Sequence, residues 1–245
     1  MSNQKYYITN QRYSDFLDTQ KQKDFGKYAY LVNKLLPENG TFLDVGCGTG
    51  IALTLINRRS KGVGVDISET SIASCVEKGL FCKLYDGYRL PFVDDYFNIV
   101  GSFNVLEHTD DPIHFLDEQF RILSKEGYLI IACPNFLSIT NNFHWHTSGL
   151  KQKVRNLTSL IKKLLSRNYN FEKMKTIERK EFHPDDDACN VVNPIDILKW
   201  SKNNKLSLED WSTHSVHTNS QFINFIDKTI FKIFFGSCFF VFKKK

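Results

Sequence analysis

The chain has 245 residues, of which 42% are hydrophobic and 24% are charged. This composition is typical of a globular protein and excludes wholesale disorder or a collagen-like chain, and the length suits one α/β domain with an elaboration. The 32 lysine and arginine residues outnumber the 27 acidic ones, and the net charge of +5 permits an anionic partner without requiring nucleic acid.

Strands and helices alternate in the first 134 residues. A helix is predicted over residues 14–36, with Ser14 as its N-cap, and residues 1–37 are a candidate N-terminal lid. Near-continuous apolar runs predict strands at 41–45, 62–66, 81–85, within 96–104 and at 128–133, separated by helices at 51–59, 68–78 and 113–123. This alternation predicts an α/β fold whose parallel sheet is covered by helices on both faces.

The alternation stops at residue 135 and resumes with a predicted helix at 194–204, followed by strands at 206–212 and 237–242. Residues 135–193 are therefore an insertion of 59 residues after the fifth strand, at the edge of the sheet where ligands bind. We expect this insertion to be a mainly helical cap that recognises the substrate. Residues 1–134 and 194–245 then form the sheet domain.

A glycine-rich loop, G-x-G-x-G at 46–50, joins the first strand to the next helix, where glycine lets a ligand approach the backbone closely. Asp44 precedes this loop, Asp66 ends the second strand 20 residues after Gly46, and Asp86 ends the third strand. Asp66 can accept both hydroxyls of a ribose, and Asp86 can accept an adenine amino group. NAD fits less well, because the third glycine comes one residue early for a dinucleotide fingerprint and no basic residue marks a pyrophosphate.

Several motifs follow one another at matching positions. They are L-D-V-G-C-G-T-G at 43–50, G-V-D-I-S at 64–68, D-G at 86–87, L-P-F at 90–92, F-N-I-V at 97–100, N-V-L-E-H at 104–108 and R-I-L-S-x-x-G-Y-L-I-I at 121–131. In combination they resemble the class I S-adenosylmethionine-dependent methyltransferases over about residues 40–134. The subgroup they are most similar to includes quinone-biosynthesis and small-molecule O-methyltransferases. The resemblance implies a Rossmann-like, seven-stranded, mostly parallel sheet.

The resemblance also implies S-adenosyl-L-methionine as cofactor and S-adenosyl-L-homocysteine as product. It places the methionine end of the cofactor at the glycine loop, the ribose at Asp66, the adenine beside Ile67, and the sulfonium near Asn104. The cofactor-binding residues that it implies are Asp44, Gly46, Cys47, Gly48, Asp66, Ile67, Asp86, Gly87 and Asn104.

His108, directly after the fourth strand, is the candidate catalytic residue. In methyl transfer the cofactor supplies the electrophile, so the protein mainly positions the acceptor, and a hydroxyl acceptor benefits from a base that works near neutral pH. The alternative is that His108 only packs at a strand–loop junction. Some members of the family carry E-x-x-E-H here and bind a divalent ion, but Asn104 replaces the first acid, so we expect no metal.

The insertion contains further polar motifs, H-W-H at 144–146 and H-P-D-D-D at 183–187. These residues could assemble a metal site, although a polar cap with solvated acids is the simpler interpretation. The candidate acceptor-contacting residues are His144, His146 and His183, together with Arg12 and Tyr13 of the N-terminal segment. The run around His183 is similar to cap segments of methyltransferases from surface-polysaccharide pathways.

Residues 151–180 hold ten basic residues against two acids, a net charge of +8, so the other 215 residues carry −3. Six apolar residues of this segment are expected on one helical face: Val154, Leu157, Leu160, Ile161, Leu164 and Leu165. We expect this face to dock on the core and the lysines to be solvated. Contact with a membrane surface, nucleic acid or an anionic acceptor is the alternative.

The cysteines and the phenylalanine-rich end indicate a cytoplasmic protein. The six cysteines form no C-x-x-C pair, so we expect reduced thiols, and the N-terminus has no apolar stretch of the secretory kind. Charged residues interrupt residues 222–242, so we predict a helix and a buried strand there rather than a transmembrane segment, with peripheral membrane contact left open.

The sequence thus favours an enzyme that O-methylates a small anionic metabolite, sugar or phosphosugar, with surface-polysaccharide biosynthesis as the suggested setting. Three alternatives stay open: methylation of a membrane quinone, methylation of RNA, and a regulator that binds the cofactor without transferring its methyl group. We expect no nucleic-acid partner, because the chain has no recognised RNA-binding module and no N-P-P-[YF] motif after the fourth strand.

Overall fold

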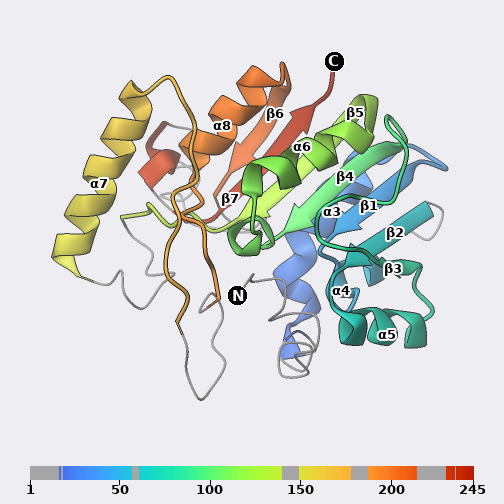
Figure 1. Cartoon of the computed structure of the whole chain (residues 1–245). Coiled ribbons are helices and arrows are strands. Elements are labelled where there is room, and N and C mark those ends of the chain that lie inside the picture. The colour runs from blue at the N-terminus through green and yellow to red at the C-terminus, as the bar shows by residue number, and fades with distance from the viewer. Residues whose placement is uncertain are drawn as a thin grey trace.

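The computed structural model describes residues 17, 19–56, 61–139, 149–177, 187–213, 230–234 and 236–245. A seven-stranded sheet in the order β3-β2-β1-β4-β5-β7-β6 forms its centre (Figure 1). The strands are β1 (Thr41–Val45), β2 (Lys61–Asp66), β3 (Cys82–Leu84), β4 (Phe97–Phe103), β5 (Leu123–Cys133), β6 (Ser207–Ser212) and β7 (Cys238–Lys243). Only β7 runs antiparallel to its neighbours, so the predicted mostly parallel sheet is confirmed.

Helices cover both faces of the sheet, because successive strand residues point to opposite sides. Phe42, Ile99 and Ile130 pack in one cluster with α3 (Gly26–Leu35), α4 (Ile51–Thr54) and α5 (Glu69–Glu77). The neighbouring Leu43, Val100 and Leu129 pack in the other cluster, with α6 (Pro112–Ile122) and α8 (Pro194–Asn203).

The helix starts follow local chemistry that the sequence shows. Ser68, Asp111 and Asn193 are N-caps whose side-chain oxygens accept backbone N–H groups of α5, α6 and α8 respectively. Pro112 and Pro194 occupy the first helical turns, where proline's missing N–H costs nothing. These signals explain why the predicted bounds of α5, α6 and α8 are within one residue of the observed ones.

Three predicted elements differ from the structure by more than one residue at an end. Helix α4 ends at Thr54 rather than at 59, with residues 57–60 outside the described part. Strand β5 begins at Leu123, five residues earlier than predicted, because Leu123 pairs with Phe97 of β4. The polar residues before Gly127 have the composition of a loop, so the sequence does not indicate this extension. Of the predicted helix at 14–36, the structure describes residue 17 and the residues from 19 onward. Here a 3-10 helix (Gln22–Phe25) precedes α3, so the continuous α-helix is shorter than predicted.

The described part of the insertion contains one helix, α7 (Leu150–Leu165), and otherwise runs without regular structure apart from a bridge between Lys173 and Asn190. Leu137, Leu160, Ile195 and Ile233 form a small core beneath α7. None of the helices in the described ranges combines the length and the apolar character that crossing a bilayer requires.

Candidate cofactor and active site

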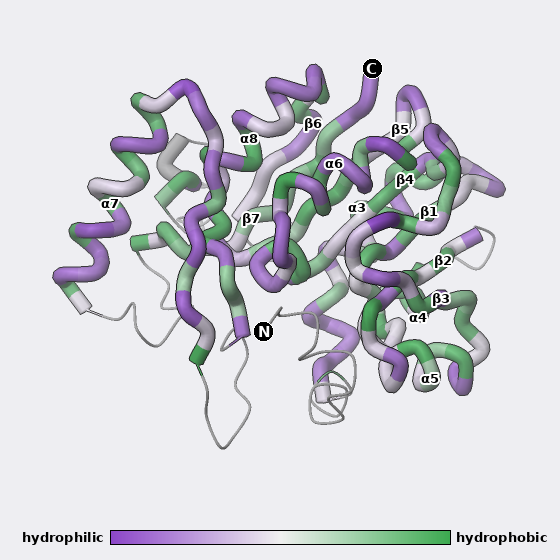
Figure 2. The backbone as a smooth tube through the Cα atoms, in the orientation of Figure 1, coloured by the Kyte–Doolittle hydropathy of each residue, from purple (hydrophilic) through white to green (hydrophobic). Residues whose placement is uncertain are grey.

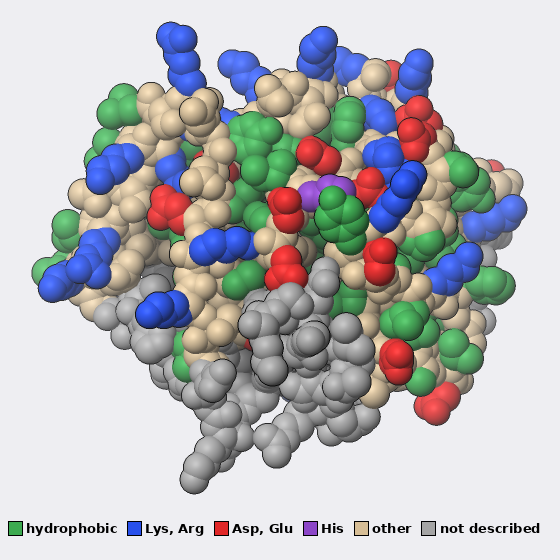
Figure 3. Space-filling view, viewed as in Figure 1, with side chains coloured by type: hydrophobic (Ala, Val, Ile, Leu, Met, Phe, Trp, Pro, Cys, Tyr) green, Lys and Arg blue, Asp and Glu red, His purple; other side chains and the backbone are tan. Residues whose placement is uncertain are grey.

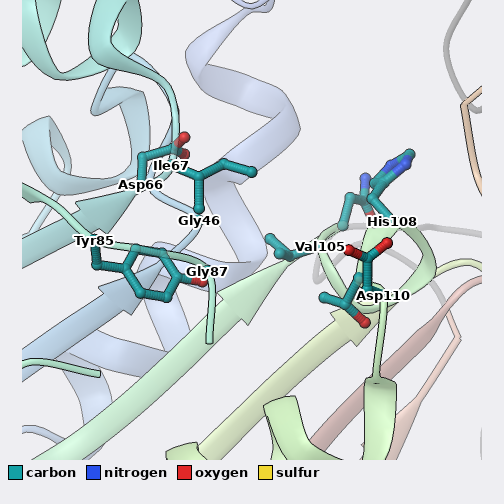
Figure 4. A pocket seen from close by; sticks show the side chains of 10 residues that line it. Gly46, Asp66, Ile67, Tyr85, Gly87, Val105, His108 and Asp110 are labelled. Atoms are coloured by element: carbon teal, nitrogen blue, oxygen red, sulfur yellow. The ribbon is translucent and has the colours of Figure 1, made fainter. Parts of the chain in front are cut away.

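A pocket opens at the carboxyl ends of the central strands (Figure 4). It lies where β1 and β4 are neighbours and the chain leaves them in opposite directions, which is where open α/β sheets bind ligands. The residues that line it are Gly46, Asp66, Ile67, Tyr85, Gly87, Asn104, Val105, His108, Thr109 and Asp110. Five of these are predicted cofactor residues, and His108 is the predicted catalytic residue.

The glycine loop after β1 turns sharply, since Gly46, Gly48 and Gly50 all have positive φ angles. A Cβ on Gly46 would lie only 2.4 Å from a methyl carbon of Val105, so a side chain there would close the pocket between the loop and β4. The N–H of Gly46 donates to the carbonyl of Val65 over 2.8 Å, which joins the loop to the end of β2. The backbone of the loop at Gly46 therefore forms part of the pocket wall.

Asp66 is the buried acid that connects the loop to the second strand. One of its carboxylate oxygens accepts the N–H of Gly48 at 2.8 Å, and the other accepts the N–H of Ser68 at 2.9 Å. Burial raises the pKa of this carboxyl, while the backbone N–H groups act in the opposite direction. The two carboxylate oxygens together can accept about four hydrogen bonds, so Asp66 can still accept a hydroxyl group of a ligand in the pocket.

Asp44 lies beneath the loop and does not line the pocket. It is buried and accepts a hydrogen bond from the hydroxyl of Tyr28, on α3, at 2.8 Å. Gly101 makes this contact possible, because a Cβ there would meet the Tyr28 hydroxyl at 2.2 Å. Burial raises the pKa of Asp44 to about 7. This hydrogen bond joins the end of β1 to α3.

The thiol of Cys47 also faces away from the pocket, toward Cys75 of α5 and Cys82 of β3. The three sulfur atoms lie within 4.8 Å of one another, and Cys75 donates to the carbonyl of Gly48 at 3.2 Å. Gly64 leaves room for this cluster, since a Cβ there would meet the Cys47 sulfur at 2.6 Å. Hydrogen bonds from Cys47 and Cys75 lower the pKa of Cys82 to about 4. The thiol cluster therefore supports the loop that carries Gly48.

The third and fourth strands supply the other pocket walls. Gly87 and the aromatic ring of Tyr85 lie along one side (Figure 4). Asp86 is exposed and is absent from the lining, and one of its oxygens accepts the N–H groups of Tyr88 and Arg89. Asn104 lines the pocket with φ of 53°, a left-handed conformation that asparagine tolerates better than most residues.

His108 lines the end of the pocket opposite Asp66 and Gly46 (Figure 4). Its Nδ1 lies 3.3 Å from a carboxylate oxygen of Asp187, and its Nε2 lies 3.7 Å from a carboxylate oxygen of Glu107. Burial lowers the pKa of His108 to about 4 and raises that of Asp187 to about 7. The imidazole is therefore uncharged at neutral pH.

The insertion holds the loop that carries His108. The side-chain amide of Asn190 donates to the carbonyl of Thr109 at 2.7 Å. The backbone N–H of Cys189 donates to the carbonyl of Glu107 at 2.9 Å. Lys173 donates to the carbonyl of Asp110 at 2.6 Å. Through these contacts the insertion determines where His108 lies.

The lining residues fit S-adenosylmethionine by their chemistry. Asp66 suits the ribose hydroxyls, Ile67 and Tyr85 offer apolar surface for the adenine, and Asp110 adds a second negative charge. The described lining contains no lysine or arginine. Such a site suits a cation like the sulfonium better than the pyrophosphate of a dinucleotide.

Four lining residues are not among those assigned from the sequence: Tyr85, Val105, Thr109 and Asp110. The same holds for Asp187 as the partner of His108. Tyr85 ends a predicted strand and Val105 lies in the N-V-L-E-H motif. Each is next to a residue that the sequence assigns to the cofactor, and this neighbourhood is the signal that could have identified them. For Asp187 none was available, because 79 residues separate it from His108. The predicted acceptor residues Arg12, Tyr13, His144, His146 and His183 lie outside the described residues.

Comparisons with known proteins match the part of the chain that contains this pocket to methyltransferases. Residues 43–131 match the family model described as "Methyltransferase domain". A Mycobacterium tuberculosis protein named "Probable S-adenosylmethionine-dependent methyltransferase MT3114" is 30% identical over 129 residues, covering 49% of this chain and 46% of that protein. The mitochondrial ubiquinone biosynthesis O-methyltransferase of Dictyostelium discoideum is 29% identical over 124 residues, covering 42% of this chain and 39% of that protein.

The fold is similar to solved structures over nearly the whole chain. A structure described as a SAM-dependent methyltransferase from Aquifex aeolicus has a TM-score of 0.55 and 16% identity, and the match covers 94% of this chain and 96% of that one. The chain spans only part of the curated relatives that it matches. In three of them the match covers between 21% and 60% of the relative's own length. The matched residues, the strand order and the chemistry of the pocket together show that this chain contains a class I S-adenosylmethionine-dependent methyltransferase domain.

Proposed function

We propose that the protein transfers the methyl group of S-adenosylmethionine to a hydroxyl of a small anionic acceptor, such as a sugar or phosphosugar of surface-polysaccharide biosynthesis, in the cytoplasm. The observation that carries the O-methylation proposal is the position of His108, whose uncharged imidazole is 14% exposed at the end of the cofactor pocket. The anionic character of the acceptor rests on the charge of +8 in residues 151–180 of the insertion.

His108 would take the proton from the acceptor hydroxyl. Nδ1 lies nearer to the Asp187 carboxylate, at 3.3 Å, than Nε2 does to that of Glu107, at 3.7 Å, so the Nδ1–H tautomer is favoured and Nε2 is the proton-accepting atom. The cofactor supplies an electrophilic methyl group when bound. Asp66 and the loop backbone hold the ribose and the methionine end, and Asn104 and Val105 position the acceptor side of the pocket.

Methylation of a membrane quinone is the second candidate. Its support is the likeness to the Dictyostelium discoideum protein, whose name assigns it to ubiquinone biosynthesis. A regulator that binds the cofactor without transferring its methyl group is the non-catalytic alternative, and in that case loss of His108 leaves function intact.

A product screen by mass tests the proposal. The protein is incubated with S-adenosylmethionine and candidate sugar nucleotides, phosphosugars and quinols, and a product heavier by one methyl group is sought. We expect His108→Ala to lower turnover by roughly 100-fold or more, as the loss of a general base typically does, and to leave S-adenosylhomocysteine binding in calorimetry unchanged. Asp66→Ala should abolish binding.

Two variants serve as matched controls. His114→Ala removes a histidine that stacks on Tyr88 and is absent from the pocket lining, and Asp210→Ala removes an exposed acid of β6. Both should keep wild-type binding and turnover. Full turnover in His108→Ala would contradict the role of the base, and the absence of any binding of either cofactor form by the wild type would contradict the whole proposal.

A further inference from the structure

Helix α7 is attached to the rest of the molecule through one narrow face. Asn156 donates to the carbonyls of Phe136 and Ser138 at 3.2 and 3.1 Å, Leu160 is completely buried, and Lys163 pairs with Asp196 at 2.6 Å. These three residues of α7 follow one another at intervals of four and three, so they lie on one side of the helix. This side is largely polar.

The apolar side of α7 faces solvent instead. Six large aliphatic residues are 39% to 82% exposed: Leu150, Val154, Leu157, Ile161, Leu164 and Leu165. They recur at helical spacing along the whole element, about a third of a turn from the docked face. The prediction that this face packs on the core is therefore wrong, apart from Leu160. A continuous exposed stripe of this kind marks an interaction surface, whereas scattered apolar residues do not.

Basic residues border the stripe on its other side. Lys151, Arg155 and Lys162 are exposed, and they lie about a third of a turn beyond it. Helix α7 contains five basic residues and no acid. Figure 2 shows hydrophilic and hydrophobic bands alternating along α7, and in Figure 3 blue and green side chains lie together on the left edge, where Figure 1 places this helix.

We propose that the exposed face of α7 binds the surface of an anionic lipid bilayer, with the aliphatic stripe inserted between the headgroups and the flanking bases against lipid phosphates. A basic amphipathic helix with an aliphatic stripe lies in the plane of such an interface. The inference concerns where the protein works and does not rest on the proposed methyl transfer.

The composition of α7 favours lipid over a protein partner. A protein that covered this helix would need an apolar groove with a dedicated acidic rim along the basic side, whereas an anionic leaflet presents negative charge over apolar chains everywhere. The same composition argues against a second copy of the chain, because two α7 helices packed along their stripes would bring the bordering bases of both copies together without an acid on either helix.

Flotation of the full chain with vesicles tests the proposal. We expect binding to vesicles that contain phosphatidylglycerol, weak binding to vesicles of phosphatidylcholine alone, and loss of binding as salt rises. Leu157→Ser with Ile161→Ser should lower the partition coefficient by at least about tenfold. Replacement of Lys151, Arg155 and Lys162 by Gln should lower it on the order of 100-fold. Because all five side chains are exposed, we expect these variants to fold.

The control pair is Val76→Ser with Leu208→Ser, which removes exposed aliphatic side chains from α5 and β6 and should bind vesicles like the wild type. Calorimetry with S-adenosylhomocysteine is run on every variant, so a loss of vesicle binding is separated from damage to the cofactor site. Vesicle binding that is absent, or equal in the α7 variants and the wild type, would overturn the proposal. So would a dimer in sedimentation that Leu157→Ser with Ile161→Ser dissociates, since the stripe would then be an interface between copies.

Discussion

At the scale of single residues, the site combines carboxyl groups that are shielded from water with a glycine loop whose backbone has no side chains on the pocket side. Asp66 and Asp44 both lie near the glycine loop, but only Asp66 reaches the pocket, while Asp44 is paired with Tyr28. Four acidic or imidazole groups in or next to the pocket have pKa values shifted mainly by burial: Asp44, Asp66, His108 and Asp187. A cluster of this kind is typical of functional sites.

Asp44 makes protein stability depend on pH. Its pKa is about 7 in the folded protein, against 3.8 for an aspartate in open water, so between these values the folded state holds a proton that the unfolded state has lost. The free energy of unfolding therefore falls as the pH rises from about 4 to 7. Asp44→Asn can still accept the Tyr28 hydroxyl but has no proton to lose.

We expect denaturant unfolding between pH 5 and pH 8 to show a smaller loss of stability in Asp44→Asn than in the wild type, by roughly 3 kcal/mol at most. Asp210→Asn, at an exposed site, should follow the wild type. Parallel pH curves for Asp44→Asn and the wild type would show that Asp44 ionises normally.

At the scale of elements, one buried ion pair joins the insertion to the sheet domain. The ammonium of Lys163, on α7, lies 2.6 Å from a carboxylate oxygen of Asp196, on α8, and also donates to the carbonyl of Asn170 at 2.8 Å. Asp196 is fully buried and also accepts the side-chain amide of Asn193 at 2.8 Å. Removal of the lysine would leave a buried carboxylate without its cation.

Lys163→Met should therefore lower the free energy of unfolding by about 3–5 kcal/mol. Lys162→Met provides a matched control, since the neighbouring lysine is exposed and its loss should change stability by less than about 0.5 kcal/mol. Chemical denaturation of the two variants measures the difference. Equal stability of the two would mean that Asp196 is satisfied without Lys163.

At the scale of the whole molecule, the insertion and the sheet share a core and a hydrogen-bond network. Leu137 and Leu160 of the insertion pack with Ile195 of α8 and Ile233, near β7. The contacts of Asn190 with the His108 loop connect the same insertion to the active site. Because the insertion is joined to the sheet domain at both places, we expect one cooperative unfolding transition.

Calorimetric melting with S-adenosylhomocysteine tests this unity. A ligand at 100 times its dissociation constant adds about 2.7 kcal/mol, which raises the melting temperature by roughly 5–10 °C in a chain of this size. The whole transition should move, and it should not move in Asp66→Ala. Two transitions, of which only one responds to the ligand, would show that the insertion unfolds separately.

The sequence by itself determined the strand and helix succession, the glycine loop, Asp66 at the end of β2 and His108 after β4. These features depend on apolar periodicity, capping residues and turn residues, which act between neighbours in the chain. The carboxyl ends of parallel strands meet at one edge, so the sequence alone assigns the strand-end residues Gly46, Asp66 and Asn104 to one pocket.

Tertiary structure alone decided the contacts between distant parts of the chain. Asp187 meets His108, Tyr28 meets Asp44, and Cys47 turns toward Cys75 and away from the pocket. The amphipathic pattern of α7 correctly predicted a helix but not the side that it buries, because the ion pair of Lys163 with Asp196 holds the polar side inward. A hydrophobic pattern states which side chains share a face, and only the packed neighbours determine whether that face meets the core or solvent.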